Sequence, residues 1–339
     1  MGASSAAPAT IGEEQRGIDY AGLVGKFAPV IFLLLVVTFF SFFESGFRTT
    51  NNFLNIIRAV SFFGILAVGM TFVILTAGID LSVGSALAFC GIVCASAAKG
   101  SRALLSGKDE GGVHVLYAFL AAIGVGLLIG LIHGVFIAYL NVPAFIVTLG
   151  GLGAWRGATL LWSNGQPISS FSKDFTHWGK QDIGQVPIPV IVFLGMGLIA
   201  HIVLKYTRYG RWVYALGGNA EAARLSGLNT RQITSSVYVI SGFCAGVSGF
   251  LLTSRLNSAE QVAGQSYELQ AIASVVIGGT SLFGGSGGVL GTLVGAVLIG
   301  VLNNGLVQMN VSAYYQPIVI GVIIVLSVYV DQVVKSRRR

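Results

Sequence analysis

Ten long apolar stretches account for most of this 339-residue chain, and no other feature limits its fold as strongly. They lie near residues 27–43, 59–77, 81–98, 114–140, 142–163, 187–206, 233–254, 268–283, 287–308 and 314–334. A helix needs about 20 mainly apolar residues to cross the ~30 Å hydrocarbon core of a bilayer. Only 10% of the residues are charged, against about a quarter in soluble domains. The sequence therefore predicts an all-α, polytopic membrane protein with about ten transmembrane helices.

Three of the ten stretches contain residues that interrupt helices. Gly78, Ile79 and Asp80 precede the third stretch, Pro143 lies in the fifth, and a glycine-rich segment, residues 278–288, follows the start of the eighth. Non-helical backbone is tolerated at membrane depth only where protein or a water-filled cavity satisfies its polar groups. We therefore expect some of the helices to be broken or re-entrant.

Lys and Arg side chains indicate the orientation, because loops that remain in the cytosol are enriched in them. The two strongest basic clusters are Lys205, Arg208, Arg211, Arg224 and Arg231, and Lys335, Arg337, Arg338 and Arg339. With ten crossings and a cytosolic N-terminus both clusters are cytosolic, although Lys99, Arg102 and Lys108 then lie outside. We expect a cytosolic tail over residues 1–26, a transmembrane domain over 27–334 with a cytosolic loop at 207–232, and a basic cytosolic tail at 335–339.

Several kinds of chemistry are missing from the sequence. It has no Gly-x-x-x-x-Gly-Lys-Ser/Thr loop for nucleotide phosphates, and its four histidines have no metal-ligand spacing. The three cysteines, Cys90, Cys94 and Cys244, all lie in apolar stretches. We therefore expect no catalytic residues, no bound cofactor and no metal site in this chain, and no nucleic-acid partner.

The predicted cytosolic loop contains the signals of a short helix. Asn219 is a good N-cap, Glu221 in the first turn complements the helix dipole, and Gly227 is a typical C-terminal residue. The pattern predicts a helix of about two turns over residues 220–226. Such a helix is either a docking site for a cytosolic partner or a surface connection between two transmembrane helices.

Further motifs follow in a fixed order over roughly residues 50–332. They are Gly69-Met70-Thr71, Gly78-Ile79-Asp80-Leu81-Ser82-Val83-Gly84, Arg208-x-Gly210-Arg211, Gly217-Gly218-Asn219, Glu221-Ala222-Ala223 with Leu225-Ser226-Gly227, Tyr267-Glu268-Leu269, Gly278-Gly279-Thr280-Ser281-Leu282, Asn303-Asn304-Gly305 and Tyr314-Tyr315-Gln316. Together they resemble the permease subunits of ribose, xylose and galactose type ABC sugar importers, the binding-protein-dependent transport system permeases.

This resemblance implies a type II-importer-like permease in the cytoplasmic (inner) membrane of a prokaryote, surrounded by membrane lipid. It also implies three partners: a second permease copy, a cytosolic ABC ATP-binding protein that holds ATP-Mg, and an extracytoplasmic sugar-binding protein. The implied cargo is a monosaccharide, ribose or a related pentose or hexose. The alternatives are the same kind of permease for a polyol, a nucleoside or a signalling sugar derivative, or a secondary carrier or channel.

The resemblance implies that the short helix couples the permease to the ATPase. The residues concerned are Asn219, Glu221, Ala222, Ala223, Arg224 and Gly227. Candidate residues of the translocation pathway or gate are the polar ones within the apolar stretches, Asp80, Ser82, Arg156, Asn303 and Asn304. Each has a structural alternative: Asp80 can cap the third helix, the asparagines can join helices, and Arg156 can reach the interface or form an ion pair.

Overall fold

Helices make up nearly all of the computed structural model, which describes residues 20–106, 113–312 and 314–336. The long helices are α1 (Tyr20–Phe43), α2 (Thr50–Leu75), α3 (Val83–Ser106), α4 (Val113–Ala138), α5 (Ala144–Ser163), α7 (Ile188–Tyr206), α10 (Thr230–Leu256), α12 (Val289–Gln308) and α13 (Tyr315–Ser336). The shorter ones are η1 (Ser45–Arg48), α6 (Lys173–Lys180), α8 (Arg208–Gly218), α9 (Ala220–Leu225) and α11 (Tyr267–Ile277). Two small antiparallel pairs join β1 (Ile168–Ser169) to β4 (Ser258–Ala259) and β2 (Asp182–Ile183) to β3 (Val186–Pro187).

Each of the ten predicted stretches contains a helix, which confirms the all-α class. Within the described residues, six helices are long and apolar enough to cross a membrane: α2, α4, α5, α7, α10 and α12. The other four stretches hold shorter apolar helices, Phe27–Phe43, Val83–Lys99, Tyr267–Ile277 and Tyr315–Leu326. The number of ten crossings therefore stays a prediction.

The ends of the predicted segments differ in detail from the structure. Helix α1 begins at Tyr20, inside the range predicted as an N-terminal tail, and α13 continues to Ser336. Residues 1–19 and 337–339 of the predicted tails lie outside the described residues. Helix α11 ends at Ile277 and is only about 16 Å long at 1.5 Å per residue, roughly half the thickness of the hydrocarbon core.

Helices α2 and α10 form the centre of the molecule, and most of their residues are buried. Lipid is as apolar as the side chains, so helices associate in a membrane through close packing and hydrogen bonds between them. The Ser248 hydroxyl donates to the Phe62 carbonyl at 2.7 Å, which joins α10 to α2. The hydroxyls of Thr71 and Thr292 lie 2.8 Å apart and join α2 to α12.

Glycines at four-residue spacing let α4 lie directly against α10. A Cβ atom on Gly126 would overlap the Gly242 carbonyl, and one on Gly134 would lie 2.5 Å from the Ser235 hydroxyl. Such spacing permits the backbones of two membrane helices to approach closely. Here the glycines serve packing within one chain.

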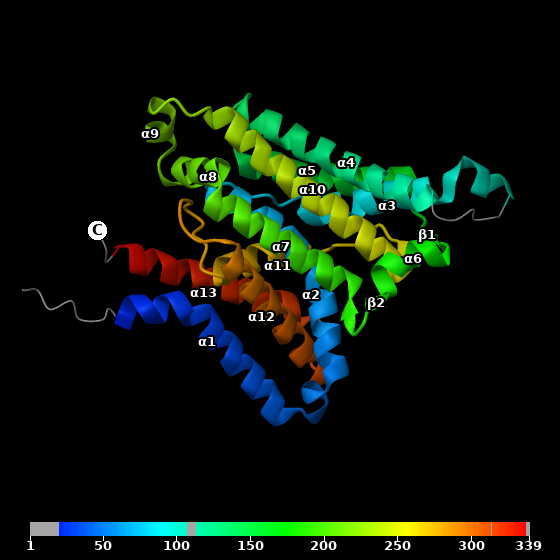
Figure 1. Ribbon diagram of the computed structural model, residues 1–339, viewed down its shortest axis with the longest axis horizontal. Helices are drawn as coiled ribbons and strands as arrows, with labels where there is room; N and C mark the ends of the chain where they lie inside the picture. The colour runs from blue at the N-terminus through cyan, green and yellow to red at the C-terminus, as the bar shows by residue number, and fades with distance from the viewer. Residues whose placement is uncertain (1–19, 107–112, 313, 337–339) are drawn as a thin grey trace, which may run out of the picture.

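The arrangement of the helices gives the molecule two different ends (Figure 1). Helices α8 and α9 lie at one end, on the left of the figure, together with the start of α1 and the end of α13. Helix α6 and strands β1 and β2 lie at the other end. The two ends of the described chain are therefore on the same side as the predicted coupling helix.

Candidate functional site

Helix α9 forms where the sequence predicts it and is fixed by the expected caps. The side chain of Asn219 accepts a hydrogen bond from the Ala222 backbone N–H at 2.9 Å. Gly227 follows the helix with φ +84°, a left-handed conformation that favours glycine. Ala223 is the buried residue of this helix, whereas Leu225 is 74% exposed. The helix therefore presents an exposed apolar side chain at the end of the molecule.

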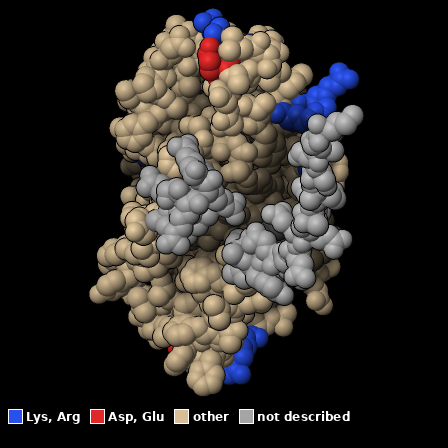
Figure 2. Space-filling model, turned by 90° about the vertical axis from the view of Figure 1, so that its left-hand side faces the viewer, with Lys and Arg blue, Asp and Glu red and all other residues tan. Residues whose placement is uncertain are grey.

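An exposed ion pair lies on the same helix. The Arg224 guanidinium donates to both carboxylate oxygens of Glu221, at 2.6 and 3.1 Å. This hydrogen bond lowers the pKa of Glu221 and raises the pKa of Arg224. Figure 2 views this end of the molecule and shows basic side chains with a carboxylate at the upper edge, where α9 lies in Figure 1.

Helix α8 attaches α9 to the transmembrane helices. Gly217 lies so close to α2 that a Cβ atom there would overlap the Leu75 carbonyl. The Tyr214 hydroxyl donates to the Gly287 carbonyl at 2.8 Å, and the hydroxyls of Tyr209 and Ser236 lie 2.7 Å apart. We call α8 and α9 together the coupling unit. It contacts α2, α10 and the glycine-rich segment 278–288, which we call the glycine loop.

Two breaks between helices meet beside the coupling unit. The first break, residues 76–82, separates α2 from α3, and the glycine loop separates α11 from α12. The Gly285 N–H donates to the Leu75 carbonyl at 3.0 Å. A Cβ atom on Gly284 would lie 3.0 Å from the Ala77 nitrogen. The coupling unit and both breaks therefore form one contiguous contact region.

Asp80 and Ser82 lie in the first break, and both are buried. One carboxylate oxygen of Asp80 accepts hydrogen bonds from the Ser82 N–H at 3.0 Å and the Ser82 hydroxyl at 2.6 Å. The other oxygen accepts from the Ser241 hydroxyl at 2.9 Å. The carboxylate thus fixes the start of α3 and attaches it to the middle of α10.

Two rings extend this network toward α4 and α5. The Trp155 indole N–H donates to His133 Nε2 at 3.1 Å, and His133 Nδ1 lies 3.5 Å from the Ser82 hydroxyl. An indole can only donate, so His133 accepts at Nε2 and is neutral, with its proton on Nδ1. Each group donates a hydrogen bond to the next in the order Trp155, His133, Ser82 and Asp80. The polar side chains of the first break are therefore hydrogen-bonded within the protein.

Arg156 bonds to the segment that precedes α11. Its Nη1 donates to the Gln261 carbonyl and, at 3.0 Å, to the Ala263 carbonyl. Glu268, in the first turn of α11, is half-buried, and its Oε2 has no hydrogen-bond partner within the described residues. Arg156 therefore positions the start of the half-length helix.

The neighbouring residues Asn303 and Asn304 have different surroundings. The carboxamide of Asn304 forms two reciprocal hydrogen bonds of 2.9 Å with Asn52. Gln308 donates to the same Asn52 oxygen at 3.0 Å. Asn303 makes no side-chain hydrogen bond within the described part of the chain and lines a cavity of about 270 Å³ between α2, α11 and α12. Asn304 lines the same cavity, but its carboxamide is paired with Asn52, whereas the carboxamide of Asn303 is not paired within the described residues.

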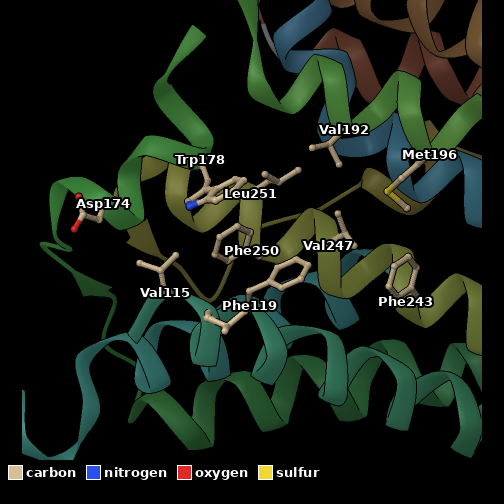
Figure 3. Close-up of a pocket in the computed structure, with 11 residues that line it drawn as sticks. Val115, Phe119, Asp174, Trp178, Val192, Met196, Phe243, Val247, Phe250 and Leu251 are labelled. Atoms are coloured by element: carbon tan, nitrogen blue, oxygen red, sulfur yellow. The ribbon is translucent and has the colours of Figure 1, made fainter. Parts of the chain in front are cut away.

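A larger cavity, of about 620 Å³, lies between α4, α6, α7 and α10 (Figure 3). Its walls are apolar side chains such as Phe119, Met196 and Phe250, with Asp174 at one edge. Such walls offer few hydrogen-bond partners to a hydroxylated solute. This cavity therefore does not have the chemistry of a polar pathway.

Within the described residues, no group of three or more His, Cys, Asp or Glu side chains is arranged to hold a metal ion. Three free cysteines, Cys90, Cys94 and Cys244, are buried among apolar neighbours.

Several important residues were absent from the sequence-based predictions. Helix α8 was expected only as part of a loop, although Thr207, whose hydroxyl accepts from the Gly210 N–H, is a recognisable N-cap. Ser241 and Asn52 gave no signal, because their partners are 161 and 252 residues away in sequence.

Comparisons with known proteins identify the family of this helical chain. A family model described as "Branched-chain amino acid transport system / permease component" matches residues 52–328. The chain belongs to this family. No solved structure matches the chain.

The curated relatives are named as sugar permeases. The chain is 45% identical over 306 residues to the ribose import permease protein RbsC of Escherichia coli K12, covering 89% of this chain and 92% of the relative. It is 37% identical to the D-allose transport system permease protein AlsC of the same strain, covering 95% and 96%. It is 32% identical to the xylose transport system permease protein XylH of Haemophilus influenzae, covering 89% and 94%. The resemblance to sugar permeases is thereby confirmed.

Proposed function

We propose that this chain is the transmembrane permease subunit of an ATP-driven (ABC) importer for a monosaccharide, ribose or a related pentose or hexose. It works with a second copy of itself, a cytosolic ATP-binding protein that holds ATP-Mg, and an extracytoplasmic sugar-binding protein. It lies in the inner membrane with both termini and the coupling unit in the cytosol. In this arrangement residues 1–26 and 335–339 are cytosolic tails, residues 27–334 form the transmembrane domain, and residues 207–232 form a cytosolic loop.

The observation that carries the proposal is the attachment of the coupling unit to both breaks. Helix α9 follows α8 directly, so a partner that moves α9 also moves α8. This movement reaches α2 and the glycine loop, because Gly217 and Tyr214 fasten α8 to them. Rigid elements that have two discrete packings convert a local movement into a change of access. The identity of up to 45% to ribose permeases over most of the chain supports the cargo class.

The coupling residues have distinct roles in this proposal. Asn219 and Gly227 begin and end the helix, the buried Ala223 packs it against the protein, and the exposed Ala222 keeps its surface small enough to enter a cleft of the ATPase. Glu221 and Arg224 form the charged edge of that surface, and the exposed Leu225 adds an apolar contact. Asp80, Ser82, Arg156 and Asn304 have hydrogen-bond partners within the protein, which supports structural roles, whereas the surroundings of Asn303 support a place in the pathway.

Reconstitution tests the function. The permease, its ATP-binding protein and its sugar-binding protein are placed in proteoliposomes, and uptake of labelled ribose, allose and xylose is measured. We expect uptake of at least one sugar that requires ATP hydrolysis and the binding protein. Uptake of a polyol or nucleoside alone would support the first alternative, and sugar uptake driven by an ion gradient without the ATPase would contradict the proposal.

A bulky residue on α9 tests the coupling role. Glu221→Trp should release the ATP-binding protein from the permease and lower ATP-driven uptake at least tenfold, because the indole would not fit a cleft shaped for a small helix surface. The matched control is Glu260→Trp, at another exposed glutamate, located at the opposite end of α10. Membrane insertion should be normal in both. Full uptake and normal ATPase binding by Glu221→Trp would contradict the role of α9.

A further inference from the structure

Four carboxamide side chains that are unpaired within the described residues line a cavity at the end of the molecule opposite the coupling unit, between walls that are otherwise mainly apolar. Asn55 lies near the start of α2, Gln270 in the first turns of α11, Asn303 near the end of α12, and Gln316 at the start of α13. All four line the cavity of about 270 Å³, which also includes Tyr267. Gln270 and Gln316 additionally line a neighbouring cavity of about 260 Å³. We call the two together the amide cavity.

None of these four carboxamides has a side-chain hydrogen bond to any residue within 20–106, 113–312 or 314–336. An amide without a hydrogen-bond partner is costly to place in hydrocarbon. Polar side chains on membrane helices therefore face one another, the protein interior or water. The pairing of Asn52, Asn304 and Gln308 nearby shows that this chain can satisfy its amides internally. The four unpaired amides are thus arranged for water or a solute.

The chemistry of the amide cavity selects a class of ligand. None of the described residues that line it is charged. Carboxamides both donate and accept hydrogen bonds, which matches hydroxyl groups. The ring of Tyr267, packed edge-on to Phe63 with centroids 6.0 Å apart, supplies a flat apolar surface for the C–H face of a sugar ring. The two cavities, of about 270 and 260 Å³, are each slightly smaller than the roughly 300–1,000 Å³ typical of small-molecule sites.

We propose that Asn55, Gln270, Asn303 and Gln316 line the entry part of the translocation pathway and bind the hydroxyls of a neutral monosaccharide. The proposal rests on the proposed function and adds the position of the sugar and its charge class. Sugar phosphates and zwitterionic amino acids are excluded, because no described side chain of the cavity neutralises their charge. Gln270 belongs to α11, which leads directly into the glycine loop, and this loop bonds to Tyr214 of the coupling unit.

Accessibility is tested first, in the assembled complex in proteoliposomes. Cysteine is introduced as Asn303→Cys or Gln270→Cys and treated with a hydrophilic, membrane-impermeant thiol reagent. The control is Leu128→Cys, at an exposed apolar position of α4. The native cysteines are buried and give a low background. We expect both test cysteines to react at least tenfold faster than the control and ribose to slow their reaction. Reaction rates equal to that of the control would overturn the proposal.

Transport separates a binding role from a structural one. Asn303→Leu should lower ribose uptake about fivefold or more, the effect of one lost hydrogen bond of ~1 kcal/mol, without lowering the amount of folded permease. Asn304→Leu, one residue away, should instead lower the thermal midpoint of unfolding. Asn303→Ser should recover part of the uptake. Dissociation of the permease pair by Asn303→Leu would overturn the proposal, since the amide would then be a contact between copies.

The two proposals fail in different ways. Absence of any sugar uptake by the unaltered complex contradicts the proposed function, while the thiol reaction still tests the amide cavity. Normal uptake by the unaltered complex together with unchanged uptake by Asn303→Leu and Gln270→Leu contradicts only the amide cavity. A sugar phosphate or leucine could instead slow the thiol reaction at the concentration at which ribose slows it. That result would contradict the proposal that the ligand is neutral.

Discussion

The first break and the glycine loop are both non-helical segments within a bundle of helices, but they are held in opposite ways. In residues 76–82 a single buried side chain, Asp80, accepts three hydrogen bonds. In residues 278–288 four glycines have positive φ, and backbone N–H groups of the loop donate to the hydroxyls of Thr280 and Ser281 and to the Leu75 carbonyl. Within the loop the Gly288 N–H donates to Thr280 Oγ1 at 3.1 Å. From α8 the Tyr214 hydroxyl donates to the Gly287 carbonyl.

The partners of the two segments indicate different mechanical roles. Asp80 fastens the first break to Ser241 in α10, the central helix that also packs along α4. The glycine loop bonds to Tyr214 of the coupling unit and, through the Gly285 N–H, to the Leu75 carbonyl at the end of α2. We therefore interpret the first break as a fixed anchor and the glycine loop as the segment that moves with α8.

Removing the anchor should have the largest effect. Asp80→Ala leaves the Ser82 N–H, the Ser82 hydroxyl and the Ser241 hydroxyl without their acceptor, and we expect a loss of about 3 kcal/mol or more in the free energy of unfolding. Asp80→Asn retains the acceptor at Oδ1 and should lose about 1 kcal/mol. Thermal unfolding of the purified permease measures both. Equal stability of Asp80→Ala and the unaltered protein would contradict the anchor.

Crowding the contact between α8 and the breaks should have the next largest effect. In Gly217→Ala the new methyl group overlaps the Leu75 carbonyl, and overpacking of this kind costs about 1–3 kcal/mol. The adjacent Gly218 has open space around it, so Gly218→Ala is the matched control. The ratio of sugar-stimulated to basal ATPase activity should fall only for Gly217→Ala. An equal fall for both variants would refute a specific contact.

Loosening the glycine loop should have a smaller effect. Tyr214→Phe removes one hydrogen bond to the Gly287 carbonyl, an effect of about 1 kcal/mol. We expect sugar-stimulated ATPase activity to fall about fivefold, with little change in the unfolding midpoint. Tyr206→Phe is the control, because the Tyr206 hydroxyl has no hydrogen bond within the described residues. A large fall in the midpoint of Tyr214→Phe would indicate that the loop is an anchor as well.

The exposed ion pair of α9 should have the smallest effect on stability. The pKa of Glu221 is lowered by Arg224, so its stabilising effect is present above the unfolded pKa of about 4.3 and is lost as the pH falls through the folded value. Between pH 6 and 8 we expect a constant, small difference in unfolding midpoint between Glu221→Gln and the unaltered permease. A difference that varies over this range would show that another group titrates with it.

Local signals made part of this arrangement predictable. Apolar length located the helices, and Asn219 with Gly227 located α9 within one residue of its end. Long-range partners were not predictable: the sequence around Asp80 fits a cap, but only the fold brings Ser241 to it. Asn303 and Asn304 are adjacent in sequence and line the same cavity, yet successive helical residues point about 100° apart, so only Asn304 pairs with Asn52.

Hydrogen–deuterium exchange of the assembled complex tests the anchor and the moving loop most directly. Exchange is compared between the nucleotide-free complex and the complex trapped with ATP and vanadate. We expect the amides of residues 278–288 and of α8 to change their protection together, while those of residues 76–82 stay protected in both states. Equal changes in the two segments, or a change confined to residues 76–82, would contradict the division of roles.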